Sequence, residues 1–285
     1  MKGFFKNIRF SVFAVLFGTS VLAQNSNPTG RKHCILDADT KEPVAYASVG
    51  VVDKSLGTVS DADGIFVMEV PEDLMQDTLR ISALGYSPFE VSVAEWKECS
   101  DTVYLIPTPL RLHEAIVRPS DRRLRHRYVG NRSGGGLFAA SADGKNGAGI
   151  GIAVPFTVKK QAWVEDVSFS ISERPDMLSK MKFRVNFYEK IGEDDFRATD
   201  IPSVYFNYSK EEIQDGRFTF AFPEPVYLDR GDYYLELEFL ENFPEETFIM
   251  KSSSLSPVRY RYASQTTWKK IPFSNTVAFG VVMVK

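Results

Sequence analysis

The sequence is poor in the residues that most metal and covalent catalysts use. Its 285 residues include only three histidines and two cysteines. A zinc peptidase needs two histidines and a glutamate around the metal, and His113-Glu114 lacks the second histidine of an HExxH helix. The Gly-x-Ser-x-Gly elbow of serine hydrolases is missing as well. We therefore expect a protein that is not an enzyme, with no catalytic residues, no metal and no cofactor.

Long apolar runs are also scarce, and the one that exists lies at the N-terminus. Three basic residues precede an apolar core at residues 10–22, and Ala23 offers a small residue before Gln24. This pattern is typical of a signal peptide, whereas a membrane-spanning helix needs about 20 apolar residues. We expect residues 1–23 to be removed, with a retained anchor as the alternative. The mature chain is then exported to the periplasm, the outer membrane or the medium, without a transmembrane span.

The sequence also lacks an excess of positive charge. Removing residues 1–23 takes away three basic residues and no acid, so the mature chain carries about −6, which argues against nucleic-acid binding. The glycine-rich stretch at 134–151 does not make a phosphate loop, because Asn146 follows Gly144-Lys145 where a P-loop needs Ser or Thr. Residues 150–154 instead favour a strand whose glycines permit close packing.

After residue 162, helical periodicity does not extend beyond a turn or two, and apolar and polar residues alternate instead. Residues 182–188 alternate in this way, and so do residues 233–239, where Glu236 and Glu238 separate apolar neighbours. Such alternation indicates half-buried strands. Strands are expected near 33–37, 47–53, 65–70, 78–83, 88–93, 102–106, 164–171, 181–188, 217–222, 233–240, 247–251, 259–263 and 276–284. The fold class is therefore all-β.

Two motifs in the first third of the chain are specific. Residues 57–66, GTVSDADGIF, place a polar turn between apolar flanks and predict a hairpin; residues 79–86, LRISALGY, end in a glycine before Tyr86. Together with Ile35-Leu36-Asp37, they resemble the carboxypeptidase-regulatory-like domain, a transthyretin-like β-sandwich common at the N-termini of exported Bacteroidota proteins. The resemblance covers residues 32–107 and implies an accessory module rather than a catalytic domain.

The rest of the chain divides at an unusual segment. Seven arginines and two acids lie between Arg111 and Arg132, so residues 108–135 form an Arg/Gly-rich linker or a partner-facing patch. Residues 136–285 are predicted to fold as a jelly-roll-like antiparallel β-sandwich. This part also resembles the C-terminal sandwich of some exported Bacteroidota proteins.

The two cysteines, Cys34 and Cys99, flank the first predicted module. In an oxidising compartment they could form a disulfide, and two free thiols are the alternative. The sequence leaves both open.

Aromatic residues give the remaining binding signal. Exposed Trp and Tyr faces on sandwiches can hold sugars, and core packing is the alternative for each one. The candidates for ligand binding are Trp268, Trp163, Tyr260 and Tyr262, and Trp268 stands out because its neighbours are polar. We expect a binding or scaffolding accessory of the envelope whose partner is a glycan, a peptide or an envelope protein. The alternative is a hydrolase of glycans or peptides with its site in the C-terminal sandwich.

Overall fold

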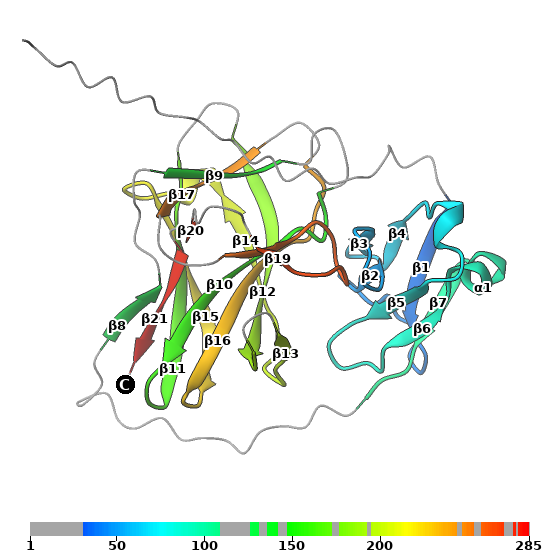
Figure 1. Ribbon diagram of the computed structural model, residues 1–285, viewed down its shortest axis with the longest axis horizontal. Coiled ribbons are helices and arrows are strands. Elements are labelled where there is room, and N and C mark those ends of the chain that lie inside the picture. The colour runs from blue at the N-terminus through cyan, green and yellow to red at the C-terminus, as the bar shows by residue number, and fades with distance from the viewer. Residues whose placement is uncertain are drawn as a thin grey trace, which may run out of the picture.

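The computed structural model describes residues 31–108, 126–130, 136–141, 147–172, 177–192, 195–243, 247–253, 258–270, 276–277 and 279–284. These residues form two β modules that follow each other along the chain (Figure 1). We call residues 31–108 the N-terminal module and the described residues from 126 onward the C-terminal module. The predicted signal peptide at 1–23 lies outside the described residues. No helix in the described part is long and apolar enough to cross a bilayer.

The N-terminal module packs two small sheets face to face. One sheet has the order β4-β1-β7 and the other β3-β2-β5-β6. A short helix, α1 (Val93–Glu98), begins at Ser92 with a capping box and buries Trp96 in the core. The strands are β1 (Lys32–Asp37), β2 (Ser48–Val51), β3 (Gly57–Val59), β4 (Ile65–Val67), β5 (Thr78–Ser82), β6 (Phe89–Ser92) and β7 (Thr102–Leu105).

The turn at residues 61–65 corrects the predicted hairpin. Asp61 does make the expected turn, because its Oδ1 accepts hydrogen bonds from the N–H groups of Asp63 at 2.9 Å and Ile65 at 2.8 Å. However, β3 pairs with β2 and β4 pairs with β1. The polar turn therefore carries the chain from one sheet to the other instead of joining two paired strands.

The second motif is explained by one hydrogen bond. The Tyr86 hydroxyl donates to Oδ2 of Asp37 at 3.0 Å, while Oδ1 of Asp37 accepts from the N–H groups of Asp39 and Thr40. The turn after β5 is thereby tied to the end of β1. These hydrogen bonds lower the pKa of Asp37. The largest effect comes from the Thr40 N–H and outweighs the opposing effect of burial, and the bonds from Asp39 and Tyr86 add to it.

The C-terminal module is an antiparallel sandwich with one large sheet and two smaller ones. The large sheet has the order β13-β12-β16-β10-β18-β19, with β14 also paired to β12; the others are β15-β11-β21-β8 and β20-β17-β9. Its strands are β8 (His126–Gly130), β9 (Gly136–Ser141), β10 (Gly151–Val158), β11 (Ala162–Ser170), β12 (Lys180–Lys190), β13 (Phe196–Ala198), β14 (Val204–Ser209), β15 (Arg217–Leu228), β16 (Gly231–Phe239), β17 (Thr247–Ser253), β18 (Arg259–Arg261), β19 (Lys269–Lys270), β20 (Thr276–Val277) and β21 (Phe279–Val284).

The predicted all-β fold is confirmed, with one change at the boundary between modules. Strand β8 lies inside the range predicted as a linker, 108–135, and pairs with β21. The C-terminal module thus begins before residue 136, because β8 completes the edge of a sheet whose other strands come from much later in the chain. Residues 109–125 lie outside the described part.

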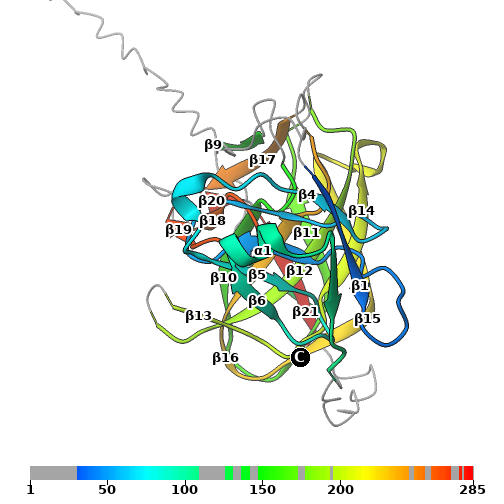
Figure 2. The same ribbon diagram turned by 90° about the vertical axis from the view of Figure 1, so that its right-hand side faces the viewer.

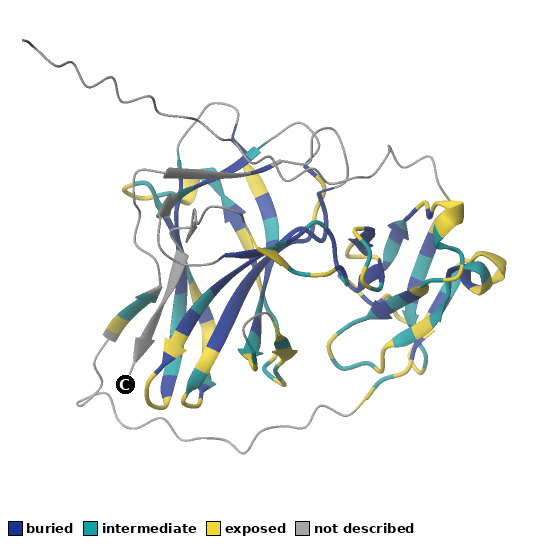
Figure 3. Ribbon diagram, viewed as in Figure 1, coloured by how far each residue is buried: buried dark blue, intermediate teal, exposed yellow. Residues whose placement is uncertain are grey.

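The two modules are in direct contact. Figure 2 views the molecule from the side of the N-terminal module, whose strands lie in front of the C-terminal module. Figure 3 shows buried residues on both sides of the junction. Hydrogen bonds between the modules join pairs of residues whose separation in the sequence is between 136 and 214 positions. This junction contains the most unusual chemistry of the molecule.

Candidate functional site

The site begins with two neighbouring strands whose polar residues face each other. In the register of β12 and β16, Arg184 lies opposite Glu238, and Asn186 lies opposite Glu236. The sequence suggests that this polar face is half-exposed, but the N-terminal module and the loop after β18 cover it. As a result, both glutamates are 0% exposed. Buried carboxylates need partners, because the loss of hydration is otherwise too costly.

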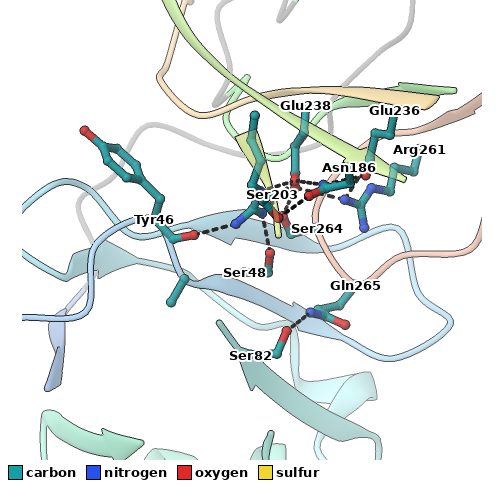
Figure 4. Close-up of polar contacts among 12 residues, drawn as sticks. Tyr46, Ser48, Ser82, Asn186, Ser203, Glu236, Glu238, Arg261, Ser264 and Gln265 are labelled. Atoms are coloured by element: carbon teal, nitrogen blue, oxygen red, sulfur yellow. Dashed lines mark hydrogen bonds and ion pairs between the residues drawn. The ribbon is translucent and has the colours of Figure 1, made fainter. Parts of the chain in front are cut away.

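Two buried arginines supply those partners (Figure 4). Nε and Nη2 of Arg184 donate to Oε2 of Glu238 at 2.9 and 2.6 Å. Nη2 of Arg261 lies 2.7 Å from Oε1 of Glu236 and 3.0 Å from Oε1 of Glu238. The Ser264 hydroxyl donates to the same oxygen of Glu238 at 2.5 Å. We call Arg184, Glu236, Glu238 and Arg261 the charge cluster.

The other oxygen of Glu236 is also occupied. Its Oε2 accepts hydrogen bonds from the Asn186 side-chain nitrogen at 2.8 Å and from the Tyr188 hydroxyl at 2.9 Å. On the neighbouring strand β10, a side chain at Gly151 would collide with Oε1 of Glu236 and with Arg261. This glycine provides the close packing that the sequence predicts for the glycine-rich stretch.

Arg184 extends the charge cluster into the N-terminal module. Its Nη1 donates to the carbonyl oxygen of Tyr46 at 2.8 Å, and its Nη2 donates to the Ser48 hydroxyl at 2.6 Å. Tyr46 has a φ of 56°, a left-handed conformation that is strained for an aromatic residue. Lys182 holds the same residue from the other end, donating from Nζ to the Tyr46 hydroxyl at 2.8 Å.

A tight turn provides the second contact between modules. We call residues 263–266 the docking turn; it is closed by the Thr266 hydroxyl, which donates to the Ala263 carbonyl at 2.7 Å. Any side chain at Gly50 or Gly57 would overlap the carbonyl oxygen of Ser264. Gln265, with a φ of 63°, donates from Nε2 to the Ser82 hydroxyl at 2.6 Å. The glycines of β2 and β3 therefore form a socket for this turn.

The charge cluster sets the ionisation of its two carboxylates in opposite directions. Burial raises the pKa of Glu236, the charge of Glu238 adds to this effect, and Arg261 compensates only in part. Burial acts in the same direction on Glu238, but Arg184, Arg261 and the Ser264 hydroxyl together outweigh it and lower its pKa. Both arginines stay charged, since the glutamates raise the pKa of each against the effect of burial.

Trp268, the strongest sequence candidate, lies beside the charge cluster but is not the exposed platform that its neighbours suggest. Its ring is half-buried and lies over the Arg261 guanidinium, 5.1 Å from ring centroid to carbon. It also contacts the rings of Tyr188 and Phe196, with centroids 5.9 and 5.8 Å away. Its polar neighbours in the sequence hide this contact, because the loop folds back over the sheet. Its role in ligand binding stays a prediction.

The other aromatic candidates lie elsewhere. Trp163, on β11, makes an edge contact with Tyr227. Tyr260 and Tyr262 form a perpendicular ring pair at 5.1 Å and pack against the core of the C-terminal module. The structure thus does not bring Trp163 together with Trp268 in one binding face.

The cysteines and the first histidine are placed as follows. Of the two alternatives for Cys34 and Cys99, this structure has the free thiols and not the disulfide. His33 belongs to the core of the N-terminal module, 4% exposed and packed on Phe66 and Trp96. Burial lowers the pKa of His33.

Among the described residues, no group of three or more potential ligands could hold a metal ion.

A cavity of 510 Å³ adjoins the junction. The N-terminal module lines it with parts of β3, β4 and the turn at 61–63, and the C-terminal module lines it with residues 240–242 and Ala148. Neither glutamate of the charge cluster lines this cavity.

The alternation of polar residues in the sequence indicates part of the charge cluster. Arg184 and Asn186 alternate on one strand, and Glu236 and Glu238 alternate on another. Opposite charges on two alternating strands indicate cross-strand pairs. What the sequence could not indicate is the cover that buries these pairs, because it comes from residues 46–48 and 263–266.

Comparisons with known proteins add one informative match. No curated protein matches the chain. Among solved structures, the chain is similar to one of the infectious bursal disease virus Gt strain, with 11% identity and a TM-score of 0.27; the match covers 89% of this chain and 63% of the viral one. That likeness is too weak to support an argument. Residues 34–117 match the family model of the CarboxypepD_reg-like domain, so the N-terminal module is a CarboxypepD_reg-like, transthyretin-like domain.

Proposed function

We propose that the protein is a non-catalytic, exported accessory that binds or scaffolds a partner with its two modules held as one unit. The observation that carries this proposal is the position of Arg184. One buried guanidinium joins Glu238 in the C-terminal module to Tyr46 and Ser48 in the N-terminal module. A regulatory-like module fixed in this way presents a composite surface. The partner is a glycan, a peptide or an envelope protein, met in the periplasm, at the outer membrane or outside the cell.

The state of the two glutamates supports a structural role. A hydrolase that uses two carboxylates needs both of them at the substrate bond. Here Glu236 and Glu238 are 0% exposed, and each forms an ion pair with an arginine. A carboxylate bound in this way neutralises its arginine and positions it for the contact between modules.

One observation favours a hydrolase as the second candidate. The pKa of Glu236 is raised while that of Glu238 is lowered, and such a division is typical of an acid and a base in one active site. Structural ion-pair networks produce the same division. Substrate access therefore decides between the two functions.

The test is incubation of the purified mature protein with glycan and peptide arrays, followed by mass spectrometry of the retained ligands. We expect saturable binding and intact ligands. The variant Glu236→Gln, which keeps one carbonyl oxygen to accept from Asn186 and Tyr188, is the control for catalysis. Cleavage by the native protein that is lost in Glu236→Gln would replace the proposal with a hydrolase. No retention by the arrays or by isolated envelope fractions would overturn the binding role.

A further inference from the structure

The cavity between the modules has an apolar floor and an acidic rim. Val59, Leu240 and Ala148 are buried together and form the floor. Ligand pockets occur preferentially where domains meet. The rim has three exposed carboxylates and one ammonium group, from Asp61, Asp63, Glu241 and Lys32.

One side of the cavity is the edge of a sheet. Strand β4 is the terminal strand of the sheet β4-β1-β7, and no other described strand pairs with its outer edge. The N–H of Ile35 donates to the carbonyl of Gly64 at 2.9 Å, so successive residues along β4 alternate between facing β1 and facing away. Val67 therefore directs its N–H and C=O away from β1. An extended chain can pair with such an edge through its backbone.

Tyr46 also lines the cavity. Its left-handed backbone and its hydrogen bonds to Arg184 and Lys182 fix its position. Strained residues that are held by their surroundings gather at ligand sites. The wall of the cavity is therefore preformed by the contact between modules.

We propose that this cavity binds a short extended peptide segment that carries a lysine or arginine side chain. The inference deepens the proposed binding function and depends on it. The aliphatic part of the side chain lies on Val59 and Leu240, and its charged end meets the carboxylates of the rim, as basic side chains do at apolar surfaces with a polar border. The excess of carboxylates over Lys32 selects a cation over a neutral or acidic ligand.

The probe is the tripeptide acetyl-Val-Lys-Val-amide, titrated into the isotope-labelled mature protein and followed by nuclear magnetic resonance. The control peptide, with norleucine in place of lysine, has the same stem without the charge. We expect saturable shifts at residues 58–67 and 240–242 with the lysine peptide, and at least tenfold weaker binding of the norleucine peptide. Equal binding of the two peptides would overturn the role of the rim.

Variants locate the site. The double variant Asp63→Asn with Glu241→Gln removes two charges and keeps the oxygen with which Glu241 accepts the N–H of Lys182. It should weaken binding of the lysine peptide at least tenfold. Glu211→Gln with Glu224→Gln, at exposed positions outside the cavity, should leave it unchanged.

Three results would reject the peptide proposal. They are no saturable shift with the lysine peptide, binding that survives the cavity variant, and saturation of the same resonances by a neutral oligosaccharide alone. The first two leave the broader binding function standing if the arrays retain another ligand. The array experiment tests the broader binding function separately: cleavage of the ligands, or no retained ligand at all, would reject it.

Discussion

Arg184 is the residue on which the contact between modules depends most. It lies on β12, yet two of its hydrogen bonds go to the N-terminal module. Its partner Glu238 is fully buried. Removing one member of a buried ion pair leaves the other without compensation, which is far more costly than the loss of an exposed pair.

The variant Arg184→Met should therefore lower the free energy of unfolding by about 3 to 5 kcal/mol. Urea denaturation followed by fluorescence measures this change. Arg197→Met is the matched control, because Arg197 pairs with Glu189 on the exposed surface, where solvent screens the pair and its loss should change stability little. Equal effects of the two substitutions would show that Arg184 is not structurally important.

The acid stability of the protein should depend on Glu238. Its folded-state pKa is lowered from 4.5, so its contribution is present above about pH 4.5 and is lost as the pH falls through the folded value. Glu236, with a raised pKa, acts in the opposite direction. Urea unfolding between pH 6 and pH 3 should show a shallower loss of stability in Glu238→Gln than in the native protein. Parallel curves would contradict this assignment.

A stability measurement tests whether Trp268 is packed in the fold or is the exposed binding residue that the sequence predicts. The variant Trp268→Ala should lower the free energy of unfolding by roughly 2 kcal/mol, less than a fully buried tryptophan, because the ring is half-buried on Arg261. Thermal denaturation measures the change, with Trp163→Ala for comparison. An unchanged melting temperature, together with lost ligand binding, would restore the exposed-platform prediction.

Among the elements, the docking turn and its socket fix how the modules approach each other. Ser264 and Gln265 reach the N-terminal module only because β2 and β3 carry glycines at the contact. The turn that holds the carbonyl of Ser264 is closed by the hydrogen bond from Thr266 to Ala263, and Gly57 belongs to a paired strand, so both sides of the contact are held in place. The contact is therefore specified by shape as well as by charge.

The variant Gly57→Ala should separate the modules or destabilise the protein by about 1 to 3 kcal/mol, as overpacking does. The added carbon would overlap backbone atoms of Ser264 and Val49. Gly192→Ala is the control, since its added carbon lies 3.2 Å from the Asp195 side chain and 3.9 Å from the Asp195 backbone nitrogen, without the overlap seen at Gly57. Small-angle scattering and thermal denaturation measure the two effects. A Gly57→Ala protein as compact and stable as the control would exclude the socket.

How much of these elements the sequence predicts depends on the range of the interactions. Alternation over residues 233–239 predicts β16 correctly, because a strand is a local pattern. The burial of Glu236 is not local: it requires Tyr188, Arg261 and the cover from the other module. For the same reason, Asp61 predicts its turn but not that β3 and β4 enter different sheets.

At the scale of the whole molecule, the contact converts two sandwiches into one body. Hydrogen bonds cross the junction at two places: Arg184 and Lys182 bond to Tyr46, and Gln265 bonds to Ser82. Most interfaces between domains are polar and allow relative motion. Here the buried ions and the close approach at the glycines oppose such motion.

Cutting the chain between the modules should therefore leave them together. We expect a protease site inserted between residues 117 and 118 to give two fragments that co-elute in size-exclusion chromatography. The same insertion combined with Arg184→Met should release the fragments. Separate elution of the fragments with the native interface would mean that the modules are held only by the intervening chain.

The long sequence separation of these contacts has a consequence for the order of folding. The N-terminal module is built from contacts within residues 31–108, whereas the charge cluster requires strands as late in the sequence as β18, which ends at Arg261. Contacts that are distant in the chain form late, since a large loop must close first. Until the modules meet, the face of β12 and β16 that holds the arginines and glutamates remains hydrated. We therefore expect water to leave the surroundings of these four charges when the two modules dock, after each sandwich has formed.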